Sequence, residues 1–298
     1  MAAETAMLSA QQEAGVALQE LPNSWNTESF PGISLYQWGE AIDANTAEHF
    51  YQICFCEHGL QAFAFHKQWT VLHPGQFLIS RYDAQTAPPL PMTGWETGLT
   101  LLIDAQRVPH DLLAAFGNGN VVQLLKQLTG ETDVCICKDP HIESLFQAML
   151  TESLNNRKLR IIELFLSLQS CDLSAMRVPA KVCSDAQIEL VAAVCKDAMS
   201  HLHEHLTIQA LSERADVSPT HLKESFRAVC DDSLYSFIRA QKMQIAAHML
   251  RTTSYRVIDI ASEVGYDNCS KFAKAFSDVM GMAPNVYRKS VRLEHHTE

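Results

Sequence analysis

The chain has 298 residues, of which 47% are hydrophobic and 19% are charged, and its formal net charge is -11. This length is enough for two domains, and the composition is that of a globular protein rather than a disordered or fibrous one. It contains no apolar run of about 20 residues, which a membrane-spanning helix requires. The first twenty residues carry glutamates but no basic start and no apolar core. We therefore expect no signal peptide and a cytoplasmic location.

Short runs with a strand-like pattern occupy the first third of the chain. Turn residues separate them, such as those at Pro74-Gly75 and Pro88-Pro89. The runs are 33–38, 50–56, 60–65, 76–79 and 98–104. They predict a compact β-sheet or barrel over residues 30–105.

After Pro109 the hydrophobic residues recur at helical spacing, as at Ile142, Leu145, Phe146 and Met149. Strands followed by helices over 110–170 predict an α+β domain spanning residues 1–172. Residues 173–184, which include Pro179 and show no clear period, are the expected linker. An all-helical domain is expected over residues 185–292.

A helical pattern occurs twice between Leu206 and Arg288, which predicts two helix-turn-helix units at about 207–229 and 257–279. Ser218 and Pro219 suit the N-cap and first position of a helix. Each restarted helix carries two large apolar residues four positions apart, and its other face is polar and basic. Such a helix can rest on a small core while its outer face reads a DNA major groove.

The charge distribution agrees with this prediction. Residues 206–292 carry 12 basic and 9 acidic residues, whereas residues 1–184 carry 10 basic and 19 acidic ones. A weakly basic DNA-binding domain next to an acidic domain should bind DNA non-specifically with limited affinity, because that affinity comes from neutralising phosphates. Specific contacts must therefore supply more of the discrimination.

These residues resemble the signature of the AraC/XylS family of transcription regulators over about the last 100 residues. The matching positions are Ile258-Asp259-Ile260-Ala261, Gly265-Tyr266, Ser270, Phe272, Phe276, Gly281, Pro284, Tyr287-Arg288 and the run 237–243. The departures are Ser277 where Lys or Arg is usual, Ala283 where Ser or Thr is common, Asp231 for Gly, and Gln241-Lys242 where Arg often stands second. Ser277 puts one DNA-backbone contact in doubt.

The resemblance implies a bacterial, sequence-specific transcription regulator with a cupin-like effector barrel and flanking helices that pair protomers. The sequence leaves open whether it acts as an activator or a repressor. Its implied partners are double-stranded promoter DNA, a small-molecule effector, RNA polymerase and a second copy of the chain. The DNA-binding residues carried over from the family are Thr220, His221, Lys223, Glu224, Arg227, Cys269, Ser270, Lys271 and Lys274. Among them, Arg227 is expected on phosphate, and Glu224 can accept from a cytosine amine.

The N-terminal region contains none of the common nucleophile, phosphate-binding, zinc-protease or dinucleotide motifs, so we assign no catalytic residue, cofactor or metal and expect no enzyme. Aromatic residues in the strands, with one His and one Arg to orient a polar ligand, are the candidate effector site, although most of the aromatics also suit a core. These residues are Trp38, Tyr51, Phe63, His66, Trp69, Arg81 and Trp95.

Nine cysteines leave a second function open. Cys54 and Cys56, like Cys135 and Cys137, are spaced so that a strand would place both thiols on one side. The alternatives are therefore core packing, a regulator that senses metal or redox state through these pairs, and a DNA-repair-type enzyme that uses a cysteine. Against the enzyme, no cysteine lies in an activating motif. Metal analysis and thiol titration separate these alternatives.

Overall fold

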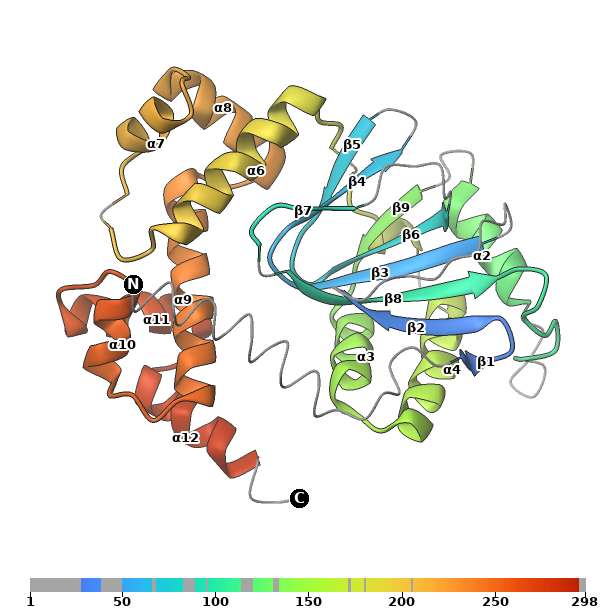
Figure 1. Cartoon of the computed structure of the whole chain (residues 1–298). Helices are drawn as coiled ribbons and strands as arrows, with labels where there is room; N and C mark the ends of the chain where they lie inside the picture. Colours follow the sequence, from blue (N-terminus) through green and yellow to red (C-terminus); the bar gives the residue numbers. More distant parts are fainter. Residues whose placement is uncertain are drawn as a thin grey trace. The chain divides into compact units, whose positions relative to one another are not determined.

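The chain divides into two compact units, one ending at Ile188 and the other beginning at Glu189. The structure is a computed structural model (Figure 1). It describes residues 28–38, 50–65, 68–82, 89–94, 96–113, 120–130, 134–170, 173–179, 181–204 and 206–294. The division falls inside helix α6 (Asp185–Ser200), just beyond the expected linker.

The N-terminal unit is built on two antiparallel sheets. Its strands are β1 (Glu28–Phe30), β2 (Ile33–Gln37), β3 (Phe50–His58), β4 (Gln61–Phe65), β5 (Gln68–Leu72), β6 (Gln76–Tyr82), β7 (Leu90–Pro91), β8 (Thr97–Asp104) and β9 (Val134–Lys138). The larger sheet has the order β1-β2-β8-β3-β6-β9, and the smaller has the order β5-β4-β7. Within the described residues β1 and β9 remain open edges, so the predicted β-rich region is confirmed but a closed cupin-like barrel is not.

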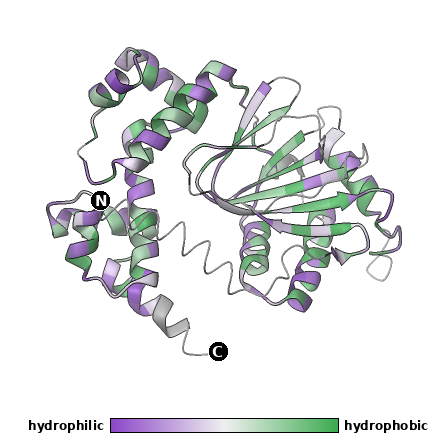
Figure 2. Cartoon of the chain, viewed as in Figure 1, coloured by the Kyte–Doolittle hydropathy of each residue, from purple (hydrophilic) through white to green (hydrophobic). Residues whose placement is uncertain are grey.

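The six-stranded sheet is buried on both faces. Successive side chains along each strand point to opposite faces, so each face has its own set of packed residues. On one face Phe55 and Phe77 contact Phe146, with ring centroids 4.8 and 5.6 Å apart. On the other face Cys54, Leu78 and Ile136 pack with Phe63 and Leu72 of the smaller sheet; we call this group the inter-sheet cluster. The strands β3 and β8 are accordingly hydrophobic along most of their length (Figure 2).

Helices cover the first of these faces. They are α2 (Val121–Thr129), α3 (Pro140–Thr151) and α4 (Leu154–Ser170), followed by the short α5 (Leu173–Met176). Strand β9 interrupts the region that the sequence predicts as helical, because its short Val-Cys-Ile-Cys run pairs with β6. Asp139 caps α3 by accepting from the backbone N–H groups of His141 and Ile142.

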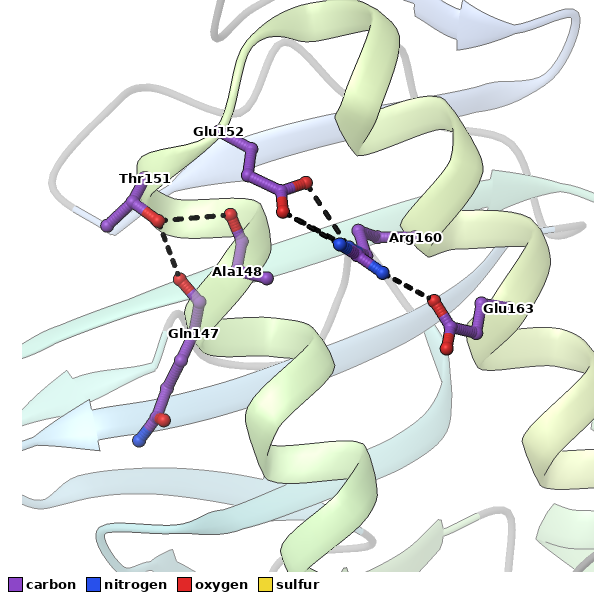
Figure 3. Close-up of polar contacts among 6 residues, drawn as sticks. All are labelled: Gln147, Ala148, Thr151, Glu152, Arg160 and Glu163. Carbon is purple, nitrogen blue, oxygen red and sulfur yellow. Dashed lines mark hydrogen bonds and ion pairs between the residues drawn. The ribbon is translucent and has the colours of Figure 1, made fainter. Parts of the chain in front are cut away.

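A polar cluster fixes the hairpin between α3 and α4 (Figure 3). The Arg160 guanidinium lies between two carboxylates, 2.9 Å from Glu152 and 2.8 Å from Glu163. The Thr151 hydroxyl lies within hydrogen-bonding distance of the carbonyls of Gln147 and Ala148 in the preceding turn. These groups are partly exposed, so the ion pairs position the hairpin more than they stabilise it.

The C-terminal unit is entirely helical in its described residues, as predicted. After α6 it contains α7 (Ile208–Arg214), α8 (Pro219–Cys230), α9 (Leu234–Thr252), α10 (Val257–Glu263), α11 (Cys269–Met280) and α12 (Pro284–Glu294). These helices alternate between hydrophobic and hydrophilic residues, as expected for helices around small cores (Figure 2). In the described parts of both units, no helix has the length and apolar character to cross a membrane.

Candidate nucleic-acid interface

The first helix-turn-helix unit consists of α7 and α8. The Thr207 hydroxyl accepts from the N–H of Ala210 at the start of α7, and Ser218 accepts from the N–H of His221 at the start of α8. Pro219 occupies the first turn of α8, where a missing N–H has no cost. The chain turns between the helices at Asp216, whose φ of 53° lies in the left-handed region.

The second unit, α10 and α11, repeats this geometry with different residues. Asn268 caps α11 by accepting from the N–H groups of Ser270 and Lys271. Gly265 has a φ of 76° at the turn, in the place that Asp216 has in the first unit. At the start of α10, Arg256 and Asp259 form a bidentate pair, and this hydrogen bonding lowers the pKa of Asp259.

Backbone hydrogen bonds show that the two turns are equivalent. The N–H of Val217 donates to the carbonyl of Ser212 at 3.0 Å, and the N–H of Tyr266 donates to that of Ala261 at 2.8 Å. The aromatic packing is duplicated as well, because Phe226 meets Phe237 edge-on at 5.3 Å, and Phe276 meets Tyr287 edge-on at 5.6 Å. The sequence repeat is thus a repeat in three dimensions.

The long helix α9 joins the two units and supplies part of the second core. Met243, Ala246 and Leu250 from α9 pack against Ile260 of α10 and Phe276 of α11. A continuous helix of this kind limits the relative motion of the two units. Their separation is therefore built into the fold.

Two arginines fasten α9 to the helices that follow it. Arg239 forms an ion pair of 2.6 Å with Asp278 on α11. Arg288 on α12 donates to the carbonyls of Leu250 and Tyr255, where α9 ends and the chain leaves it. The first contact connects α9 to α11 and the second connects the end of α9 to α12, and the sequence pattern alone did not assign them.

The residues predicted to contact DNA all lie on the exposed faces of α8 and α11. These residues are Thr220, His221, Lys223, Glu224, Arg227, Cys269, Ser270, Lys271 and Lys274, and each is exposed. Phe226 and Phe276 lie on the opposite, fully buried faces. Neither helix therefore needs its outer face for folding.

The basic residues on these outer faces differ in their ion pairing from other basic residues of the C-terminal unit. Arg214 pairs with Asp197 and Glu204, and Arg239 and Arg256 have acidic partners too. Among the described residues, by contrast, the basic residues of α8 and α11 have no acidic partner; these are Lys223, Arg227, Lys271 and Lys274. Their positive charge remains available to phosphates or base edges.

Two departures from the family pattern acquire a structural explanation. The Ser277 hydroxyl donates to the carbonyl of Ala273, so this side chain is engaged with its own helix α11. Lys242 is buried on α9, its ammonium lies 6.0 Å from the centre of the Tyr266 ring, and burial lowers its pKa. Lys242 therefore belongs to the packing of the second unit rather than to its outer face.

The candidate effector residues do not form one group. Trp38 packs against the inter-sheet cluster that contains Phe63, whereas Tyr51 lies in the helix-covered core on the other face. The Trp69 indole donates to Asp185 at 2.7 Å, and Arg81 is exposed at the end of β6. His66 and Trp95 lie outside the described residues.

A buried polar chain on the inter-sheet face was missed by the sequence prediction. The Trp38 indole donates to Thr100, whose hydroxyl donates to the Cys54 sulfur at 3.4 Å. The Cys54 thiol donates to the Gln52 amide oxygen, and the Gln52 amide donates to the Ser80 hydroxyl at 3.0 Å. Alternate polar positions on neighbouring strands are the signal that could have found it.

The two cysteine pairs lie on opposite faces of the six-stranded sheet. Cys54 and Cys56 belong to the inter-sheet cluster, and Cys135 and Cys137 to the helix-covered core. Four thiols so placed cannot bind one zinc ion. The described chain also contains no group of three or more His, Cys, Asp or Glu side chains arranged to hold a metal.

The helical C-terminal unit is similar to known proteins. Residues 211–290 match the family described as "Helix-turn-helix domain". The chain is 32% identical to the HTH-type transcriptional activator AarP of Providencia stuartii over 90 residues, which are 30% of this chain and 67% of AarP. It is 31% identical to the regulatory protein SoxS of Escherichia coli over 88 residues, which are 30% of this chain and 82% of SoxS.

Longer relatives are matched only in part, since the similar segment spans about 30% of their length. A solved structure of the AdpA DNA-binding domain with a target DNA is 26% identical, and the match covers 39% of this chain and all of that domain with a TM-score of 0.34. Residues 211–290, which match the family model, include the end of α7 and the whole of α8, α9, α10 and α11. The chain belongs to the AraC/XylS family of DNA-binding transcription regulators.

Proposed function

We propose that this regulator reads promoter DNA by placing α8 and α11 in successive major-groove segments. The observation that carries the proposal is the duplication of a capped helix whose outer face is basic, exposed and without acidic partners. Thr220, His221, Lys223 and Glu224 on α8, and Cys269, Ser270, Lys271 and Lys274 on α11, then face bases. Arg227, near the end of α8, contacts phosphate.

Among the predicted DNA contacts, those of α8 carry both signs of charge, whereas those of α11 carry only positive charge. Glu224 would repel a misplaced phosphate but accept from the amine of a correctly placed cytosine. Its role is therefore in specificity rather than affinity. The α11 face, with Lys271 and Lys274, supplies more of the attraction to the DNA backbone.

The test is a selection of bound genomic DNA by the full chain, followed by footprinting of a fragment comprising residues 185–298. Because 173–184 is the proposed linker, this fragment should fold by itself and protect the same sites. Two protected segments one helical turn apart are expected from two readers on one α9. Protection of a single segment would overturn the two-reader proposal, and a helical fragment without any footprint would show that the reader is not self-contained.

The N-terminal unit is proposed to bind a small-molecule effector on the inter-sheet face and to pair two protomers through its helices. The buried chain from Trp38 through Thr100, Cys54 and Gln52 to Ser80 supports this location. A polar ligand could exchange hydrogen bonds with these groups, while Phe63 covers it. The paired protomers, bound to DNA in the cytoplasm, would then activate transcription together with RNA polymerase. They would have no enzymatic activity of their own.

A thermal-shift screen of metabolites on the full chain tests the effector, because a ligand that binds the folded state raises the melting temperature. A true effector must also change the DNA affinity of the full chain. Gln52→Leu should abolish both responses, while Tyr51→Phe, on the opposite face of the sheet, should keep them. A hit that stabilises both variants equally would place the effector site elsewhere.

A further inference from the structure

Cys135 and Cys137 bring two thiols together at the edge of the larger sheet. They lie two residues apart on β9, point to the same side, and their sulfur atoms are 3.3 Å apart. Both are buried, with 5% and 0% of their surfaces exposed. Since β9 is the last strand of its sheet, this pair lies next to an edge rather than in the sheet's centre.

The surroundings make these two thiols chemically unequal. The hydrogen bond from Cys137 and the positive charge of Arg177 lower the pKa of the Cys135 thiol to about 7, although burial opposes this. The same contact and burial raise the pKa of Cys137. The positive charge of Arg177 therefore favours Cys135 as the nucleophile of the pair, with Cys137 as the second thiol beside it.

The pair at Cys54 and Cys56 shows that this chemistry does not follow from spacing alone. Burial raises the pKa of Cys54 to about 12 and that of Cys56 well above its ordinary value. The Cys54 thiol is engaged with Gln52 and Thr100, and the Cys56 thiol with the backbone carbonyls that follow it. That pair is therefore an internal control for the reactivity of the β9 pair.

The β9 thiols also lie beside the segment that leads to α6. The N–H of Val178 donates to the carbonyl of Ile136, the residue between the two cysteines, at 2.8 Å. Arg177 bridges to Cys137 and donates to the carbonyl of Leu128. Farther along, the backbone of Cys183 exchanges hydrogen bonds with Trp69. Arg177 and Val178 are thus held by the larger sheet, and Cys183 by the smaller sheet, before α6 begins.

We propose that Cys135 and Cys137 are a reversible dithiol switch, oxidised to a disulfide by a small peroxide, that alters DNA binding through the backbone at Val178 and Cys183. The Cys135 thiolate attacks one peroxide oxygen and releases hydroxide, which leaves a sulfenic acid. Cys137 then loses its proton and attacks the Cys135 sulfur, and a second hydroxide leaves. Overall, two thiols and one hydrogen peroxide give one disulfide and two waters. A dithiol reductant then returns the protein disulfide to two thiols by exchange and is itself oxidised to a disulfide.

Geometry gives the disulfide a structural consequence. Two residues of a strand rise by about 6.6 Å, near the upper limit of about 6.8 Å for the Cα separation of bridged cysteines. That separation is longer than the usual one of about 5.5 to 6 Å, and the sulfur atoms must approach from 3.3 Å to about 2.05 Å. Closing the bond should therefore contract β9 at Ile136, whose carbonyl accepts from Val178. The contraction should shift Val178 and hence the start of α6. The effect on DNA rests on the proposed function, whereas the disulfide does not.

The experiment treats the full chain with hydrogen peroxide, alkylates the remaining thiols, digests with trypsin, and measures DNA affinity in parallel. Residues 127–138 form one tryptic peptide that contains both cysteines. We expect this peptide to lose two hydrogen atoms and resist alkylation. The Kd for the selected DNA should change about fivefold or more, and dithiothreitol should restore both properties.

Cys137→Ala should stop the reaction at a Cys135 sulfenic acid that dimedone traps, and Cys135→Ala should leave Cys137 reduced. Both variants should lose the peroxide response in DNA binding. Cys56→Ala, on the other sheet face, should keep the disulfide and the response, and circular dichroism confirms that each variant is folded. If reduced protein has no specific DNA site, the proposed function fails, and the alkylation pattern still decides the disulfide.

Three results would overturn the switch. Full alkylation of the peptide after peroxide would show that its thiols do not react. A disulfide that leaves DNA affinity unchanged would remove its regulatory role. Binding of a thiophilic metal ion to the pair, with no disulfide under peroxide, would make it a metal site instead.

Discussion

The two helix-turn-helix units have the same backbone conformation at the turn between their helices, but different residues adopt it. At the turn between their helices the first unit has Asp216, with a φ of 53°, and the second has Gly265, with a φ of 76°. After the reading helix the first unit has Asp231, and the second has Gly281. In both units the left-handed conformation is required by position, and only the residue that adopts it changes.

The reason for the difference at the first turn lies in what surrounds it. A Cβ atom at Gly265 would lie 2.7 Å from the carbonyl oxygen of Leu202 and 2.8 Å from the Lys242 ammonium. Asp216 is exposed and has room for its side chain. The second turn therefore requires glycine for space as well as for φ, whereas the first tolerates an Asp, whose short polar side chain suits αL. The following predictions use this contrast.

Loss of the second unit's central ring should have the largest effect. Phe276 is fully buried and contacts both Phe272 and Tyr287. Phe276→Ala should lower the free energy of unfolding by about 3 to 5 kcal/mol, since it removes apolar contacts and leaves a cavity. Urea unfolding of the full chain, followed by circular dichroism, measures the change. Phe226→Ala is the matched variant in the first unit, and a loss below 1 kcal/mol in either would refute the equivalence of the two cores.

Adding a methyl group at the second turn should lower the free energy of unfolding somewhat less than Phe276→Ala does. Gly265→Ala combines the left-handed backbone cost with a collision against a backbone carbonyl, about 3 kcal/mol in all. Gly281→Ala is the control, because a Cβ there meets no atom within 4 Å and only the backbone cost remains. The same urea experiment compares the two variants. Equal losses would show that space at Gly265 is not what selects glycine.

Removing a single base contact should have a smaller effect than these core and turn substitutions, and it is measured as DNA affinity rather than as the free energy of unfolding. Lys223→Ala and Lys274→Ala should each weaken binding to the selected site by about 1 to 3 kcal/mol and relax base preference locally. Arg227→Ala should weaken specific and random DNA alike and reduce the salt dependence of binding. Titrations at several salt concentrations provide both quantities. If all three variants lose affinity equally on both DNAs, the assignment of the reading faces is wrong.

The C-terminal unit was the more predictable of the two because its local signals agree with its packing. Ser218, Pro219 and Gly265 mark a cap, a helix start and a turn, and the period of Phe272 and Phe276 identifies the buried face. Once the buried face is known, the exposed face of the same helix follows. The ion pair between Arg239 and Asp278 did not follow, because it depends on how separate helices meet.

The N-terminal unit was harder to predict because its larger sheet is buried on both faces. Where both faces are apolar, alternation does not reveal which side a residue points to. Trp38 and Tyr51 therefore could not be separated from sequence, although they lie on opposite faces. The sequence prediction also missed β5 and β9, and β9 lies between two stronger helical patterns. It missed the two shortest strands as well, β1 with three residues and β7 with two.

The smallest expected effect is the reverse substitution at the first turn. Asp216→Gly relieves the left-handed cost of a residue with a Cβ and removes a negative charge near the carboxyl end of α7, where the helix dipole disfavours it. Glycine also increases the freedom of the unfolded chain, which opposes the gain. We expect a net stabilisation of about 0.5 kcal/mol, seen as a slightly higher urea midpoint with an unchanged slope. Asp216→Ala keeps the Cβ but loses the charge, so it separates the two causes. A stabilisation by alanine equal to that by glycine would mean that charge, and not φ, distinguishes this turn from the one at Gly265.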